Sequence, residues 1–186
     1  MRTQPSNVFI LRGMNFYFEC LQRGKGSCVS DDQSSIIADM LKILAANLLA
    51  PYTVIRFYSL RLLKHISSIL GFEDVFDFFN IALKIESTPV TYETYRGRLL
   101  EYRRIAVFRF PDRILQHSEL FLLLPLRILI GQFYVNFAVL WKPLTDIVEE
   151  MSRRLLQNVF WPFLAEVLQK ANDDAGNYQG YYYLFL

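Results

Sequence analysis

The stretch from Leu126 to Phe163 constrains the fold more than any other part of the sequence, because its apolar residues recur in steps of three and four. These residues are Leu126, Ile130, Phe133, Phe137, Leu140, Leu144 and Val148. Side chains with this spacing share one face of an α-helix. Pro143 interrupts the stripe, and proline cannot donate the backbone hydrogen bond of a helix interior. The stretch therefore predicts two helices joined by a tight corner at Pro143.

The same arrangement occurs earlier, where an apolar helical pattern ends at Ala50 and a second one begins after Pro51. The two prolines are 92 residues apart, which equals two units of 46 residues. That period lies in the range of HEAT and armadillo repeats. We therefore expect an all-α protein, built as an α-solenoid of HEAT- or armadillo-like antiparallel helix pairs.

Local signals place the expected helices along the chain. One begins after Asp31 and Asp32, whose charges suit a helix N-terminus. Gly71 is the expected C-terminal cap of the next. Further helices are expected over 72–86, from Thr91 to Phe108, over 119–141, and after Asn158. Residues 1–33 are expected to be poorly ordered, residues 34–171 to form the helical repeats, and residues 172–186 to form an irregular tail.

The composition is unusually apolar for a soluble monomer: 53% of the residues are hydrophobic and 20% are charged, with 16 Phe and 11 Tyr. This excess predicts faces that pack on neighbouring structure, as in a fragment of a longer protein. A membrane protein with a span near 120–141 is the alternative. Arg127 lies inside that span, followed by Gln132 and Asn136, and an arginine there costs several kcal/mol. The favoured interpretation is a core helix of a solenoid with one edge exposed to solvent.

The main charged feature is an arginine cluster, and the net charge of +2 neither requires nor excludes a nucleic acid. With tyrosines among them, arginines can contact phosphates and stack on unpaired bases. Arg96, Arg98, Arg103 and Arg104 point in different directions around one expected helix, whereas a nucleic-acid footprint should cluster on one face. This arrangement favours a face that is solvated or contacts protein. The candidate RNA or partner contacts are Arg96, Arg98, Arg103, Arg104, Arg109 and Arg113.

No catalytic, cofactor or metal residue is expected. His65 and His117 have no Cys, Asp or Glu at metal-ligand spacing, and Cys20 and Cys28 match no zinc module or disulfide framework. Phosphate-binding and nucleophile motifs are absent from the sequence. The carboxylates Glu149 and Glu150 are adjacent and point apart on a helix. The sequence therefore predicts a non-enzyme that uses no cofactor.

Two segments resemble a known family. They are IALKIESTPVTYETYRGRLLEYRRIAVF (81–108) and LPLRILIGQFYVNFAVLWKPLTDIVEEM (124–151), the latter followed by VFWPFLAEVLQKA. Together with IRFYSLRLL (55–63), they resemble the small-subunit processome component 20 family, also called the down-regulated-in-metastasis family. The shared features are the E…P…Y…R…LL run, the PLR-L-G-Y-NF–LW-P core and the following FW. The resemblance covers about residues 34–171.

Members of that family are very large HEAT-repeat proteins, so the resemblance implies that this chain is a fragment of such a protein. It also implies a nucleolar scaffold in pre-rRNA processing and small-subunit ribosome biogenesis, associated with the snoRNA-guided early pre-ribosome. The implied partners are other processome proteins, neighbouring repeats, and pre-rRNA or snoRNA. No catalytic residue is implied. A general helical protein-interaction adaptor without a ribosomal role is the remaining alternative.

Overall fold

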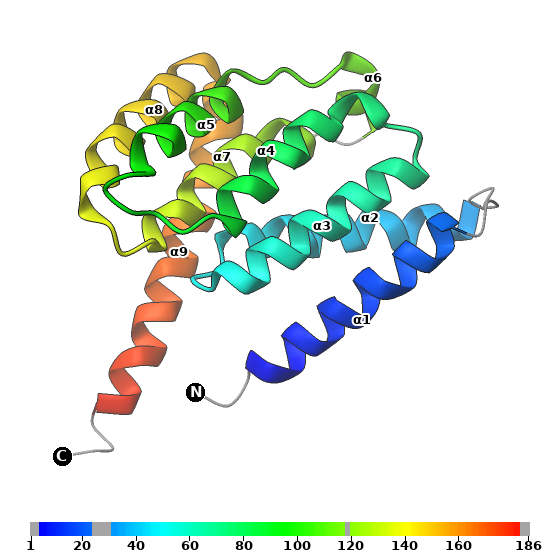
Figure 1. The fold of residues 1–186 in the computed structure, drawn as a ribbon, viewed down its shortest axis with the longest axis horizontal. Helices are drawn as coiled ribbons and strands as arrows, with labels where there is room; N and C mark the ends of the chain where they lie inside the picture. Colours follow the sequence, from blue (N-terminus) through cyan, green and yellow to red (C-terminus); the bar gives the residue numbers. More distant parts are fainter. Residues whose placement is uncertain (1–3, 24–30, 118–119, 183–186) are drawn as a thin grey trace. The chain divides into compact units, whose positions relative to one another are not determined.

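The computed structural model describes the backbone of residues 4–23, 31–117 and 120–182, and within these ranges the protein is all-α, without a β-strand (Figure 1). The α-helices are α1 (Gln4–Arg23), α2 (Asp31–Ala46), α3 (Thr53–Ile69), α4 (Phe76–Ser87), α5 (Tyr95–Val107), α6 (Asp112–His117), α7 (Leu120–Gly131), α8 (Trp141–Arg154) and α9 (Gln157–Tyr182). Short 3-10 turns are η1 (Asn47–Leu49), η2 (Glu73–Val75), η3 (Gln132–Tyr134) and η4 (Ala138–Leu140). The predicted all-α class is confirmed.

The chain divides into two compact units, residues 1–148 and 149–186. In unit 1, α3 packs against α1, α2 and α4, and α5 follows against α4 (Figure 1). Helix α7 contacts α5 on one side and α2 with η1 on the other. The contact between α2 and α7 closes these helices into a ring, which a linear series of stacked repeats would not require. Unit 2 contains the end of α8 and all of α9.

Gly71 ends α3 as the sequence predicts. Its φ is +73°, in the left-handed region that glycine adopts without strain. The backbone N–H of Gly71 donates to the carbonyl of Ser68, and that of Phe72 donates to the carbonyl of Ser67 at 2.8 Å. This pair of bonds is the Schellman arrangement, which satisfies the last carbonyls of a helix. The turn reverses the chain so that α4 packs back on α3.

The corner predicted at Pro143 lies earlier in the structure. Helix α7 stops at Gly131, and the chain runs through η3 and η4 before α8 begins at Trp141. Pro143 is the third residue of α8, a position that tolerates proline because no helical hydrogen bond is required there. The single predicted stripe is therefore broken, and Phe133 is 36% exposed instead of buried.

The two ends of the chain also differ from expectation. Residues 4–23, expected to be poorly ordered, form α1, which packs along α3 through buried Leu11. Asn15 fixes this contact, because its side chain donates to the carbonyl of Tyr58 at 3.1 Å. At the other end α9 continues to Tyr182, where an irregular tail was expected. Residues 9–17 are apolar on several sides and residues 172–182 are mostly polar, so neither segment shows the single narrow stripe that marks a helix in sequence.

The core of unit 1 lies between α3, α4, α5 and α7. Its fully enclosed aromatic residues are Phe78, Phe79, Tyr102 and Phe121. The rings of Phe78, Phe108 and Phe110 pack in tilted and edge-to-face arrangements, with centroids 4.8–5.1 Å apart. Within the described residues, no helix combines the length and apolarity needed to cross a bilayer.

Candidate interaction surface

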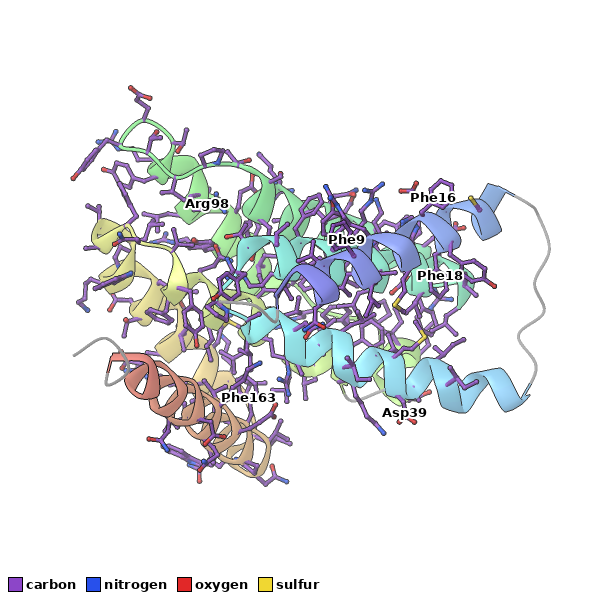
Figure 2. All side chains as sticks on the ribbon, turned by 90° about the horizontal axis from the view of Figure 1, so that it is seen from below. Phe9, Phe16, Phe18, Asp39, Arg98 and Phe163 are labelled. Carbon is purple, nitrogen blue, oxygen red and sulfur yellow. The ribbon has the colours of Figure 1, made fainter. Side chains whose placement is uncertain are left out.

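The six candidate arginines separate into three groups, and Arg98 forms the first. Its side chain is 6% exposed and donates to the carbonyl oxygens of Ile85 and Thr88, at the C-terminus of α4 (Figure 2). These carbonyls have no partner within their own helix, and a guanidinium there also complements the negative end of the helix dipole. Burial lowers the pKa of Arg98. Arg98 therefore holds α5 to α4 and is unavailable to RNA.

Arg104 and Arg113 form the second group, because each pairs with a carboxylate. Arg104 donates to Glu101 at 3.0 Å, and Arg113 lies 2.9 Å from Asp74. Glu101 also accepts from Lys84 at 2.6 Å. The hydrogen bond from Lys84, with the charge of Arg104, lowers the pKa of Glu101. These two arginines are exposed, but their charge is partly neutralised.

Arg96, Arg103 and Arg109 form the third group. All three are exposed, and among the described residues none of them forms an ion pair with a carboxylate. Arg96 and Arg103 are seven residues apart on α5 and share one face of the helix. The same face carries Leu100 and Val107, which are 64% and 59% exposed. We call these four residues the α5 stripe.

The opposite face of α5 is buried. Apolar spacing alone would turn Tyr95, Leu99, Tyr102 and Ala106 inward, whereas the buried residues are Arg98, Glu101, Tyr102 and Ile105. The buried face is therefore rotated about the axis of α5 by about one residue position, because Arg98 and Glu101 have hydrogen-bond partners inside the protein. This rotation is what sends Arg96 and Arg103 outward.

Aromatic side chains gather beside the N-terminus of α5. The ring of Tyr92 meets that of Phe137 at 5.1 Å, and Tyr95 lies 6.5 Å from the same ring. Tyr92 remains 76% exposed. The arginine-and-tyrosine combination seen in the sequence is thus present at one end of α5, whereas Tyr102 lies in the core.

A buried ion pair, which sequence reasoning missed, joins α3 to α4. Arg56 on α3 donates two hydrogen bonds to Glu86 on α4, at 2.8 and 2.9 Å, and the two side chains are 1% and 2% exposed. The remaining Arg56 donors reach the carbonyl of Ala50 at 2.7 Å and the hydroxyl of Thr53 at 3.1 Å. A buried pair is tolerated when its polar atoms are satisfied in this way.

Gln132 extends this network to the end of α7. Its amide donates to Glu86, and its carbonyl oxygen accepts from the hydroxyl of Tyr102 at 3.2 Å. Burial raises the pKa of Tyr102 to about 12, although the neighbouring Arg98 guanidinium acts in the opposite direction. Gln132 and Arg127, interpreted in the sequence as a wet edge, are in fact 2% and 9% exposed. Side chains from α3 and η3 therefore converge on the one carboxylate of α4.

The sequence contained a signal for this network. Arg56 precedes Leu60 by four residues and Leu63 by seven, and both leucines are fully buried. Arg98 stands at the same intervals before Tyr102 and Ile105. An arginine in register with an apolar helical face indicates a buried guanidinium when an acidic residue occupies a similar position elsewhere.

His65 lies in a half-buried position on α3, with Nε2 3.9 Å from Glu19 of α1. Burial lowers its pKa, and the nearby Glu19 carboxylate opposes that shift. No group of three or more His, Cys, Asp or Glu side chains in the described part of the chain could hold a metal ion. The side chain of His117 lies outside the described residues.

A groove of about 320 Å³ lies between α1, α2 and the start of α3. Its walls are mainly apolar, with Ile10, Met14, Met40 and Ile43, and Asn7 and Asn47 add polar groups. Beside it, α1 exposes Phe9 and Phe16, which are 67% and 69% accessible (Figure 2). Helix α1 is therefore apolar on two sides, one facing α3 and one facing solvent.

Comparison of the chain with known protein-family models gave no match. Comparison with solved protein structures also gave no match.

Proposed function

We propose that the chain is a non-catalytic helical scaffold that acts in small-subunit ribosome biogenesis, as part of a HEAT-type α-solenoid of the small-subunit processome. The proposal rests on the resemblance of residues 55–63, 81–108 and 124–151 to the component 20 family. In this role, exposed helix faces bind other processome proteins, neighbouring repeats and pre-rRNA or snoRNA. The corresponding location is the nucleolus.

One observation supports the resemblance more than any other: its three segments meet at a single place in the fold. Arg56 comes from the first segment, Glu86 from the second, and Gly131 with Gln132 from the third. A β-carbon on Gly131 would lie 2.3 Å from the carbonyl oxygen of Leu48 and 3.0 Å from Cδ of Arg56. The three segments that carry the resemblance thus pack together in one core.

The exposed apolar face of α1 and the apolar groove beside α2 also support a scaffold, because such faces are typical of surfaces that pack on further structure. They support a general helical adaptor equally well. The ribosomal role therefore depends on the resemblance, and its test must be made on ribosomal particles.

The test uses cells that express the natural protein containing this chain, tagged at its own locus. Sedimentation of nucleolar extracts should place the tagged protein with early pre-ribosomal particles, and its depletion should cause precursors of the small-subunit rRNA to accumulate. A general adaptor would neither sediment with these particles nor alter precursor rRNA. A protein recovered in the membrane fraction without detergent treatment would contradict both assignments.

A further inference from the structure

The outward face of α5 combines two exposed arginines with two exposed aliphatic residues in one line. Arg96, Leu100, Arg103 and Val107 follow one another at steps of four, three and four residues. They lie opposite the buried face that holds Arg98 and Tyr102. A face turned to solvent normally carries polar side chains, and here every second position of the stripe is apolar.

The charges of this face are unbalanced. Glu101 lies on the flank of α5, where it is already shared by Lys84 and Arg104. Glu93 precedes the helix and lines a separate hollow with Gly97 and Thr88. Neither Arg96 nor Arg103 forms an ion pair within the described ranges. An occupant of the α5 stripe should therefore supply carboxylates.

The aliphatic positions decide between classes of partner. Single-stranded RNA binds through basic side chains together with aromatic rings on which bases stack. The rings beside the stripe are Tyr92 and Tyr95, which pack on Phe137 at the N-terminal end of α5, next to Arg96. Further along the stripe, Leu100 separates the two arginines and Val107 follows Arg103, where a nucleic-acid footprint would place polar groups or further rings. A protein helix satisfies both kinds of side chain, because its apolar face can cover Leu100 and Val107 while flanking acidic residues meet the arginines.

We propose that the α5 stripe is a docking site for an acidic amphipathic helix of a partner protein. Arg96 and Arg103 are about 10.5 Å apart along the helix axis, given the rise of an α-helix. A partner helix packed along α5 matches them with Glu or Asp two turns apart and with Leu or Ile between. This inference goes beyond the ribosomal assignment and holds whether or not the chain acts in the nucleolus.

The probe is a fluorescein-labelled helical peptide of about 18 residues, in which Glu and Leu alternate on one face at steps of four and three. Binding to the full chain is measured by fluorescence anisotropy at two salt concentrations. A matched peptide with Lys in place of Glu and a single-stranded oligouridine are measured in parallel. We expect the Glu peptide to bind at roughly micromolar concentration, as a small interface allows, and to bind more weakly at high salt.

Variants identify the surface. The double variant Arg96→Glu/Arg103→Glu should bind the Glu peptide at least about tenfold more weakly, or by 1.4 kcal/mol. It should bind the Lys peptide instead. Leu100→Asp should also weaken binding. Arg109→Glu is the control, because Arg109 is exposed and lies beyond the end of α5. Circular dichroism checks that each variant retains its helix content.

Three results would overturn the proposal. The first is no saturable binding of the Glu peptide. The second is equal loss of binding in Arg109→Glu and in the double variant, which would indicate a non-specific charge effect. The third is binding of oligouridine, but not of the peptide, in a manner that depends on Arg96 and Arg103, which would assign the stripe to RNA.

Discussion

Arg56 and Glu86, thirty residues apart in sequence, are joined by two hydrogen bonds in the interior of unit 1. Replacing Arg56 by Met should reduce the free energy of unfolding by about 3–5 kcal/mol, because it leaves the Glu86 carboxylate buried without its counter-charge. The double variant Arg56→Met/Glu86→Leu should recover most of this loss, because no buried charge remains. Urea unfolding followed by circular dichroism measures both. A double variant less stable than Arg56→Met would show that the hydrogen bonds themselves dominate.

Gly131 should not tolerate a side chain. Its β-carbon would meet the carbonyl oxygen of Leu48 at 2.3 Å, so Gly131→Ala must displace the backbone of η1 or the end of α7. We expect a loss of about 1–3 kcal/mol, as for overpacking elsewhere. Gly97→Ala is the matched control: Gly97 lies inside α5 with open space around its Cα, so the change should stabilise by about 0.5–1 kcal/mol. Equal effects at the two glycines would contradict the close approach.

Tyr102 should make the protein sensitive to alkaline pH. Its folded-state pKa of about 12 is above the ordinary value of 10.0, so the neutral phenol is favoured in the fold. This stability is present below pH 10 and is lost as the pH rises through 12, by up to roughly 3 kcal/mol. Tyr102→Phe loses the bond to Gln132 but should show a shallower fall in stability between pH 9 and 11. Parallel curves for the two proteins would exclude this role of Tyr102.

Buried Arg98 and exposed Arg96 should respond differently to substitution, although they are only two residues apart in the arginine cluster. Arg98→Met removes the donors that satisfy Ile85 and Thr88, and it should reduce stability by about 1–3 kcal/mol. Arg96→Met removes an exposed charge and should change stability by less than about 0.5 kcal/mol. Thermal unfolding of the two variants gives the comparison. Similar melting temperatures would mean that Arg98 contributes no cap to α4.

The exposed face of α1 should cause the isolated chain to self-associate. Phe9 and Phe16 are two turns apart on that face, and burying such a ring contributes roughly 1.5–3 kcal/mol. The variant Phe9→Glu/Phe16→Glu should shift sedimentation velocity profiles toward the monomer. The control is Leu156→Glu, which changes an exposed leucine directly before α9. It should leave the sedimentation profiles unchanged. A wild-type chain that is monomeric at high concentration would remove the basis for this prediction.

Protonation of His65 should lower the free energy of unfolding as the pH falls. Its folded-state pKa is below 6.5, so below that value the unfolded chain binds more protons than the folded one. Stability therefore falls as the pH drops through 6.5, and the fall ends once the folded-state pKa is passed. His65→Gln should show a smaller difference in stability between pH 7.5 and pH 5. The same difference in both proteins would assign the acid sensitivity to carboxylates such as Glu101.

Elements with local signals were predictable from sequence. Gly71 correctly predicted the end of α3, because a left-handed C-terminal cap depends on a single residue. The long helix expected over 119–141 was not predictable to its end, because α7 ends at Gly131, whose backbone lies close to that of Leu48, more than eighty residues away. The outward direction of Arg96 and Arg103 depends in the same way on the partners of Arg98 and Glu101. The apolar register of Arg98 on α5 indicates a buried guanidinium, but its acceptors on α4 are set by the tertiary fold.

The carboxylate of Glu86 also limits how unit 1 can be shortened. Repeat proteins can lose a whole repeat, because each repeat contacts only its neighbours. In unit 1 such a deletion is limited by Glu86, which binds a guanidinium 30 residues before it and an amide 46 residues after it. Deleting α3, α4 or the end of α7 would leave a charged or polar group buried without its partner. We therefore expect backbone amides in these three elements to exchange with solvent as one cooperative block, with no intermediate in which a single helix pair is open.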